Sequence, residues 1–176
     1  MVIKDLRELE ITGHRRVWKP FMEKYNVQKL VEVGVFRGEN FQLMIEHNPE
    51  VAVAVDSWAN DGITANDAKL SQDRLDEQYE CFRAMMMHKG VQIKRGHTDE
   101  LANDYEDNYF DLAYIDGDHS YEGCKKDLIA WYPKVKRFFI GDDYDKRGVI
   151  KAVNEFADNN NLTVHELTRH GWIIVK

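Results

Sequence analysis

Acidic residues follow several short apolar runs of this 176-residue sequence, at positions where carboxylates could do chemistry. Asp56 follows the run 51–55, and Asp116 follows the run 110–115. Each run predicts a β-strand, and ligands of an open parallel sheet bind beyond the carboxyl ends of its strands. One acid at such a position often only caps the helix that follows. Acids after several strands fit a shared binding site better.

The end of the first predicted strand and the turn that it enters carry Glu32, Gly34 and Gly38. This turn has neither the three-glycine dinucleotide fingerprint nor a Lys-Ser/Thr phosphate motif. A carboxylate in this turn suits a cationic ligand group and would repel a pyrophosphate. Asp56 can accept hydrogen bonds from ribose hydroxyls. A cationic nucleoside without phosphates describes S-adenosylmethionine better than NAD, although an acid after the second strand serves NAD equally well.

A second acidic group comprises Asp116, Asp142 and Asp143, which follow the fourth and fifth predicted strands. Three converging carboxylates repel one another unless a cation joins them. All-oxygen ligands favour Mg²⁺, Mn²⁺ or Ca²⁺ over zinc, so the sequence predicts a magnesium-type site. The alternative is that Asp143 or Asp118 caps a loop and that no metal binds.

The elements that position these acids alternate between apolar runs and helical stretches, which is typical of a parallel α/β sheet. The predicted strands are 30–35, 51–55, 91–94, 110–115, 138–140, 162–167 and 172–175. The last connection, around His170 and Gly171, is too short for a parallel crossover, so the last strand must be antiparallel. Helices are predicted around 41–45, 75–86, 121–131 and 149–156.

The sequence is expected to form a single domain over residues 1–176. Residues 1–27 form an N-terminal helical segment in which Leu6, Trp18, Phe21 and Met22 pack over the sheet, and residues 28–176 form the catalytic core. A polar loop is expected between Ser57 and Leu70.

The overall composition limits the possible partners and the cellular location. The formal charge of −7, from 24 basic and 31 acidic residues, disfavours nucleic acid as a main partner. The sequence shows no secretory leader and no long apolar run, so membrane insertion is not expected. Cys81 and Cys124 are interpreted as reduced core thiols, which fits a cytoplasmic protein.

Four segments resemble a family of class I methyltransferases that includes macrocin-type sugar O-methyltransferases. They are VEVGVFRGEN (31–40), VDSW (55–58), YIDGDHSYEG (114–123) and GDDY (141–144). Catechol O-methyltransferases share the general metal plan. The resemblance extends from about Gln28 to the C-terminus. It implies a Rossmann-like fold with a seven-stranded, mostly parallel sheet, an antiparallel last strand and helices on both faces.

The resemblance also implies roles for individual residues. Glu32, Gly34 and Gly38 would line the methionine and ribose end of S-adenosylmethionine, Asp56 would hold the ribose, and Trp58, His97 and Thr98 would flank the adenine. Asp116 is also expected among the cofactor-binding residues, and Asp116, Asp142 and Asp143 would bind Mg²⁺. Asp116 and His119 are the catalytic candidates, with His119 as a base or as a support for the metal site. Asn40 departs from the family, in which many members carry a small hydroxyl residue at this position.

The expected function is a Mg²⁺-assisted transfer of a methyl group to a hydroxyl of a small molecule, a sugar or another diol, by in-line displacement. Three alternatives stay open: an NAD-dependent oxidoreductase, a non-catalytic nucleoside- or metabolite-binding relative, and a related metal site with oxygen or hydrolytic chemistry. A homo-oligomer is also left open by the sequence.

Overall fold

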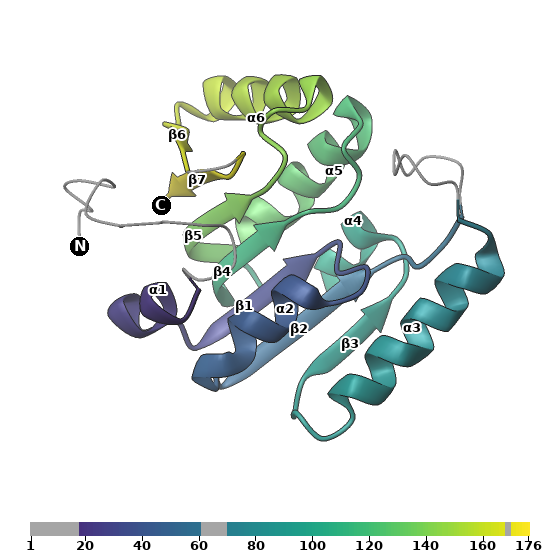
Figure 1. Cartoon of the computed structure of the whole chain (residues 1–176). Helices are drawn as coiled ribbons and strands as arrows, with labels where there is room; N and C mark the ends of the chain where they lie inside the picture. The colour runs from purple at the N-terminus through teal and green to yellow at the C-terminus, as the bar shows by residue number, and fades with distance from the viewer. Residues whose placement is uncertain (1–17, 61–69, 168–169) are drawn as a thin grey trace.

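The computed structural model describes residues 18–60, 70–167 and 170–176. Within these residues, seven strands form one sheet in the order β3-β2-β1-β4-β5-β7-β6 (Figure 1). They are β1 (Lys29–Val33), β2 (Val51–Asp56), β3 (Gln92–Arg95), β4 (Phe110–Ile115), β5 (Val135–Gly141), β6 (His165–Glu166) and β7 (Trp172–Val175). Strands β1 to β5 pair in parallel, and β7 pairs antiparallel with β5 and β6. The predicted Rossmann-like α/β sheet is confirmed.

Helices cover both faces of the sheet (Figure 1). One face carries α1 (Trp18–Tyr25), α2 (Glu39–Met44) and α3 (Gln72–Met86), and the other carries α4 (Thr98–Leu101), α5 (Tyr121–Trp131) and α6 (Arg147–Asn160). Short 3₁₀ turns extend α2, α4 and α5 at Ile45–His47, Ala102–Asp104 and Tyr132–Lys134. The core therefore consists of two apolar layers, one on each side of the sheet.

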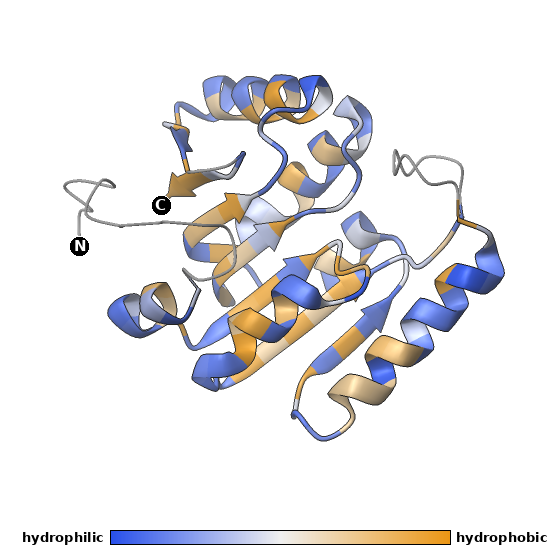
Figure 2. Cartoon of the chain, in the orientation of Figure 1, coloured by the Kyte–Doolittle hydropathy of each residue, from blue (hydrophilic) through white to orange (hydrophobic). Residues whose placement is uncertain are grey.

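Alternating side chains of the strands feed these two layers. In β1, Leu30 packs with the α1–α3 layer, whereas Val31 and Val33 pack with the α4–α6 layer. Because both faces are covered, the central strands are mostly apolar rather than alternating, as Figure 2 shows, and Glu32 of β1 and Asp111 of β4 are buried acids within them. Each fully buried aliphatic side chain of this kind contributes about 1.5–3 kcal/mol to stability.

Helix α1 belongs to this core although it precedes the first strand. Trp18, Phe21, Met22 and Tyr25 are spaced at i, i+3, i+4 and i+7, and all four are buried. The Trp18 ring meets Tyr114 of β4 edge to face at 5.1 Å between ring centroids. Trp18, Phe21 and Met22 of the expected N-terminal segment thus pack over the sheet, whereas Leu6 and residues 61–69 of the expected loop lie outside the described residues.

Several elements differ from the sequence-based expectation. Helix α4 was not predicted, because it has only four residues and no apolar periodicity. Strand β5 begins at Val135 rather than Phe138, and β6 has two residues rather than the six expected over 162–167. Cys124 is buried as expected, but Cys81 is exposed on α3. No helix among the described residues is both long and apolar enough to span a membrane.

Candidate functional site

The carboxyl edge of the sheet is held in place by backbone hydrogen bonds that continue beyond the strands. The residue that follows each of four strands donates its N–H to a carbonyl group near the end of a neighbouring strand. These bonds run from Gly34 to Val55, Gly96 to Asp56, Asp116 to Val33 and Asp142 to Ile115, at 2.7–3.1 Å. The loops that carry the predicted site residues therefore start from fixed positions.

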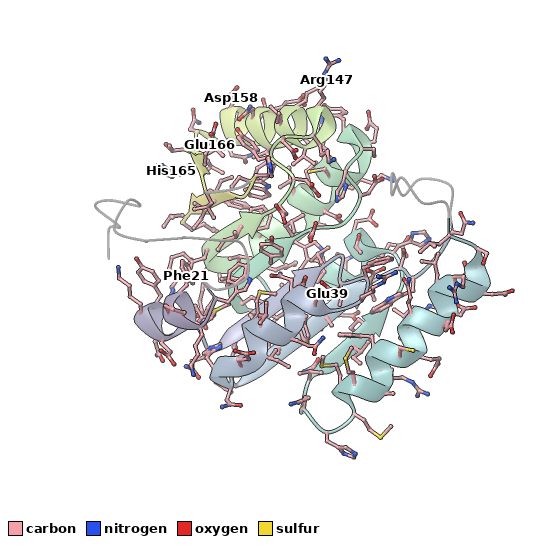
Figure 3. All side chains as sticks on the ribbon, viewed as in Figure 1. Phe21, Glu39, Arg147, Asp158, His165 and Glu166 are labelled. Atoms are coloured by element: carbon pink, nitrogen blue, oxygen red, sulfur yellow. The ribbon has the colours of Figure 1, made fainter. Side chains whose placement is uncertain are left out.

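A cavity of about 450 Å³ lies at this edge. Eight of the predicted site residues line it, and they are Glu32, Gly34, Asp56, Trp58, His97, Thr98, Asp116 and His119. Gly38, Asp142 and Asp143 are not among its lining residues. Glu39 at the start of α2, labelled in Figure 3, also lines the cavity. The structure thus brings together the ends of β1, β2, β3 and β4, as the sequence predicted.

Glu32 is a buried carboxylate in the wall of this cavity, with 1% of its surface exposed. Its Oε1 accepts a hydrogen bond from the Asn40 amide at 3.2 Å. Its Oε2 has no hydrogen-bond partner among the described residues. Burial raises the pKa of Glu32 well above its ordinary value, and the charge of Asp116 adds to this effect. An unpaired buried carboxylate oxygen is costly, so a ligand that donates to it would stabilise the site.

The two glycines of the first turn have different roles. Gly34 adopts φ +89°, and a Cβ there would collide with the backbone carbonyl of Asp116. Gly38 adopts φ +75°, and a Cβ there would collide with the Phe82 ring of α3. Gly34 therefore keeps the strand ends close together beside the cavity, whereas Gly38 lets α2 pack against α3.

Asp56 fixes the two loops on either side of it. Its Oδ2 accepts the backbone N–H of Phe36 at 2.7 Å, and its Oδ1 accepts that of Trp58 at 2.8 Å. Burial raises the pKa of Asp56, and these N–H groups oppose the rise. Each carboxylate oxygen has a second lone pair, so Asp56 can still accept a hydrogen bond from a ligand hydroxyl.

Trp58 lines the cavity from a position within the core. Its side chain is 1% exposed, its ring packs against Tyr79 and Phe82, and its indole N–H donates to the Phe36 carbonyl at 2.9 Å. Its backbone lies in the left-handed region, at φ +41°. Trp58 thus contributes to the cavity wall while its indole is held within the core.

His97 and Thr98 form the third wall, and two side chains of α5 hold Thr98 there. The Thr98 hydroxyl donates to Asp127 at 2.5 Å, and the Thr98 carbonyl accepts the indole N–H of Trp131 at 3.0 Å. Asp127 also lines the cavity, and burial raises its pKa to about 7. The loop after β3 is therefore clamped onto α5.

The second acidic group differs in membership from the predicted one. Asp116, His119 and Asp143 each present a possible ligand atom within 4.8 Å of the other two. The His119 Nε2 lies 2.7 Å from Asp143 Oδ2 and 3.7 Å from Asp116 Oδ1. The Asp142 carboxylate instead accepts a hydrogen bond from the backbone N–H of Asp143 at 2.8 Å and another from the side-chain hydroxyl of Tyr114. Two carboxylates and one imidazole are thus gathered at the ends of β4 and β5.

Charge balance dominates this group. Asp116 and Asp143 raise the pKa of His119 to about 10, so its imidazole is protonated at neutral pH. Burial raises the pKa of Asp116 to about 6, although His119 opposes the rise. The pKa of Asp143 is lowered, chiefly by its hydrogen bond with His119. The raised pKa of His119 and the lowered pKa of Asp143 thus both reflect the attraction between the imidazolium and the carboxylates.

The neighbouring Asp118 caps the loop that leads into α5. Its carboxylate accepts the backbone N–H of Ser120 at 2.8 Å and the Ser120 hydroxyl at 2.9 Å. The Ser120 hydroxyl accepts the Gly123 N–H at 3.1 Å, which confirms the predicted helix cap. Asp118 therefore has the capping role that the sequence left open for it.

Three functional candidates were missed in the sequence. Asn40 lies eight residues after Glu32, and their contact depends on how α2 packs on β1. Asp127 carries a detectable signal, because it is an acid within the apolar stripe of Cys124, Leu128 and Trp131. Tyr114 is a polar-tipped residue within the apolar strand β4, and its partner Asp142 lies in another segment.

The sequence matches the model of one protein family. The model of a family described as "Methyltransferase domain" matches residues 31–144, which is more than half of the chain. This chain belongs to that family, and the predicted methyltransferase class is confirmed. No curated protein matches the sequence.

Solved structures of methyltransferases share the fold at low sequence identity. An O-methyltransferase from Bacillus cereus in complex with S-adenosylhomocysteine is 11% identical, with a TM-score of 0.61 over 97% of this chain and 86% of that chain. The O-methyltransferase TomG from Streptomyces achromogenes, in complex with S-adenosylmethionine, is 10% identical, with a TM-score of 0.62 over 89% and 75%. The S-adenosylhomocysteine-bound methyltransferase PaMTH1 from Podospora anserina is 12% identical, with a TM-score of 0.60 over 89% and 74%.

Proposed function

We propose that this protein is an S-adenosylmethionine-dependent O-methyltransferase that acts on a small hydroxyl-bearing acceptor. The observation that carries the proposal is the unpartnered carboxylate oxygen of Glu32 in a cavity at the carboxyl edge of the sheet. In its ionised form, which a bound cation favours, this carboxylate attracts a cationic ligand and repels a pyrophosphate. The similar solved structures with S-adenosylmethionine or S-adenosylhomocysteine bound support the same cofactor.

The lining residues suggest how the cofactor would be held. Glu32 would accept a hydrogen bond from the amino group of the methionine portion, and Asp56 would accept the ribose hydroxyls. Trp58, His97 and Thr98 would enclose the base, with Asp127 holding the position of Thr98. Gly34 would leave room for the cofactor to approach the backbone.

A divalent cation fits the second group of side chains. Two carboxylates and an imidazole nitrogen within 4.8 Å of one another are a common donor set for such ions. Asp116, His119 and Asp143 would hold the ion, and Asp142 would orient Asp143 through its hydrogen bond. The sequence-based choice of Mg²⁺ stays a proposal, because an imidazole is a less usual ligand for Mg²⁺ than an oxygen. When bound, a divalent ion lowers the pKa of an acceptor hydroxyl.

Methyl transfer breaks the bond between the sulfonium sulfur and the methyl carbon and forms a bond from that carbon to the acceptor oxygen. The acceptor proton must then pass to a base. Asp116, whose pKa is about 6 when no ion is bound, is one candidate base through a carboxylate oxygen that does not hold the ion. His119 is the other candidate, through a ring nitrogen that does not hold the ion and only in its neutral form, which a cation beside Asp116 and Asp143 would favour.

The resemblance of the segments 114–123 and 141–144 supports a vicinal diol, on a sugar or a catechol, as the acceptor. Macrocin-type and catechol-type enzymes act on such groups. The side chains of Asp116 and Asp143 would lie beside the two adjacent hydroxyls of such a diol.

The test is a thermal-unfolding comparison of S-adenosylhomocysteine with NAD, each with and without Mg²⁺. A ligand at a hundred times its dissociation constant stabilises a protein by about 2.7 kcal/mol. We expect a shift of several degrees with S-adenosylhomocysteine and none with NAD. Stabilisation by NAD alone would contradict the proposal and favour an oxidoreductase.

A screen of diols with labelled S-adenosylmethionine then tests the transfer itself. Asp116→Asn is expected to abolish transfer while S-adenosylhomocysteine still binds. Retention of full activity by this variant would overturn the assigned role of Asp116.

A further inference from the structure

Trp18 of α1 is connected to the floor of the proposed cofactor site by a hydrogen bond. Its side chain is buried at 5% exposure, and its indole N–H donates to Oδ1 of Asn40 at 2.6 Å. Asn40 lies in the first turn of α2 and lines the cavity. The helix that precedes the sheet thus contacts a side chain of the site directly.

This contact determines which way the Asn40 amide faces. An indole N–H can only donate a hydrogen bond, so it must meet the amide oxygen rather than the amide nitrogen. The Asn40 nitrogen then faces Glu32 and donates to Oε1 at 3.2 Å. In the opposite orientation, two oxygens would face each other, and that arrangement is repulsive.

The consequence appears at the other oxygen of Glu32. Because Asn40 engages Oε1, Oε2 is the atom left without a partner among the described residues. The carboxylate is thus hydrogen-bonded at one oxygen and, within the described part of the chain, unpaired at the other. Hydrogen bonds thus connect Trp18 to Asn40 and Asn40 to Glu32, whose unpaired Oε2 lies at the end of this chain of contacts.

Trp18 also contacts the acidic side of the site through its ring. The ring meets Tyr114 at an interplanar angle of 90°, and the Tyr114 side chain bonds to Asp142. One residue of α1 therefore touches a partner of Glu32 and a partner of Asp142. Its N–H makes the first contact and its ring makes the second, so the two contacts can be separated by substitution.

We infer that Trp18 is a positioning residue of the cofactor site: its indole N–H orients Asn40 so that Glu32 presents one free oxygen to the cationic end of the cofactor. This inference rests on the proposed function. It adds that α1 takes part in cofactor binding without touching the cofactor. The alternative is that Trp18 only fills space between α1 and the sheet.

Trp18→Phe separates these two roles, because it keeps an aromatic ring and removes the N–H. Trp172→Phe is the matched control. Trp172 is fully buried, and its indole N–H has no partner in the described part of the chain. Both variants lose similar apolar volume from the core, but only Trp18→Phe loses a hydrogen bond.

The experiment measures the dissociation constant of S-adenosylhomocysteine by calorimetry. Trp18→Phe is expected to weaken binding about 3- to 10-fold, the range for one hydrogen bond, and Trp172→Phe less than 2-fold. In an Asn40→Ala background the effect of Trp18→Phe should disappear, because both substitutions interrupt the same series of contacts. Equal effects of the two tryptophan variants, or an undiminished effect in that background, would overturn the inference.

A second readout needs no ligand. The indole ¹⁵N–¹H resonance of Trp18 is identified by its loss in Trp18→Phe, and it should move in Asn40→Ala while that of Trp172 stays in place. An unmoved Trp18 resonance would overturn the inference whether or not the protein binds cofactor. A moved resonance together with no S-adenosylhomocysteine binding by the wild-type protein would instead overturn the proposed function, and with it the cofactor role of Trp18.

Discussion

At the β1–β2 end of the cavity, Asp56 accepts backbone N–H groups from Phe36 and Trp58, whereas at the β4–β5 end Asp143 is paired with the side chain of His119. The first carboxylate is held by the main chain, whose geometry the sheet fixes. The second is held by a proton on an imidazole between two acids. The β1–β2 end is thus organised by the main chain itself. At the β4–β5 end, a metal ion could replace the proton of His119 as the positive charge beside the carboxylates.

This difference fits the two tasks that the proposed function assigns. A nucleoside of fixed shape is best bound by a rigid cradle, because ordering a flexible one on binding costs free energy. A site for a cation needs close carboxylates that a proton can balance while no ion is bound. Each of the following predictions tests one side of this comparison.

The largest expected effect is that of Gly34→Ala, at the β1–β2 end of the cavity, where the main chain holds Asp56. The new Cβ would strike the Asp116 carbonyl, and a non-glycine residue at φ +89° is strained. We expect a loss of about 3 kcal/mol or more in the free energy of unfolding, measured in urea. Gly90→Ala is the control, since Gly90 also has positive φ (+69°) but nothing lies within 4 Å of its Cβ position. A similar loss in both variants would refute the packing argument.

Asp56→Ala is expected to weaken S-adenosylhomocysteine binding at least 100-fold, which corresponds to about 2.7 kcal/mol. It removes the acceptor of two backbone N–H groups as well as the proposed acceptor of the ribose hydroxyls. Calorimetric titration measures the change. Asp73→Ala, at an exposed acid of α3, should change binding less than 2-fold. Tight binding by Asp56→Ala would remove Asp56 from the site.

At the β4–β5 end of the cavity, Asp143→Asn should lower the pKa of His119 from about 10, because it removes a negative charge beside the imidazole. A folded pKa above the unfolded value of about 6.5 means that the charged imidazole stabilises the fold fully below pH 6.5. This stabilisation is lost as the pH rises toward 10. The difference in the free energy of unfolding between the wild-type protein and Asp143→Asn should therefore become smaller as the pH rises from about 6.5 toward 10.

An NMR titration of His119 measures this pKa directly. Asp145→Asn is the control, because Asp145 lies beside His170 rather than His119. An unchanged His119 titration in Asp143→Asn would show that the pair is not coupled as described.

The smallest expected effect is that of Ser120→Ala, which removes the cap of α5 directly after the acidic group. Loss of an N-cap hydroxyl costs about 1 kcal/mol of stability. Chemical denaturation should detect this loss, while cofactor binding stays within 2-fold. A large loss of binding would mean that the β1–β2 end of the cavity depends on the cap of α5, which would contradict the proposed difference between the two ends.

The sequence was sufficient to place the strands and to group the acids. Apolar runs such as 51–55 and 110–115 correspond closely to β2 and β4, because strands buried on both faces cannot contain many polar residues. The acids that follow them meet because parallel strands end at one edge. Eight predicted site residues line one cavity for this reason.

Details that depend on helix packing could not be predicted in this way. The contact of Asn40 with Glu32 and that of Asp127 with Thr98 depend on how α2 and α5 are rotated against the sheet. Spacing along the chain also does not determine rotamers, so it could not show that His119, rather than Asp142, lies between Asp116 and Asp143. Residues 162–167 were apolar enough to predict a strand, but only His165–Glu166 pair with β7.

The most direct test of the central claim is a crystal structure of the protein soaked with S-adenosylhomocysteine. The account predicts the ribose hydroxyls within hydrogen-bond distance of Asp56 and the amino group on the Oε2 of Glu32, with little movement of the 34–38 turn. A ligand bound elsewhere, or an empty cavity at saturating concentration, would contradict it.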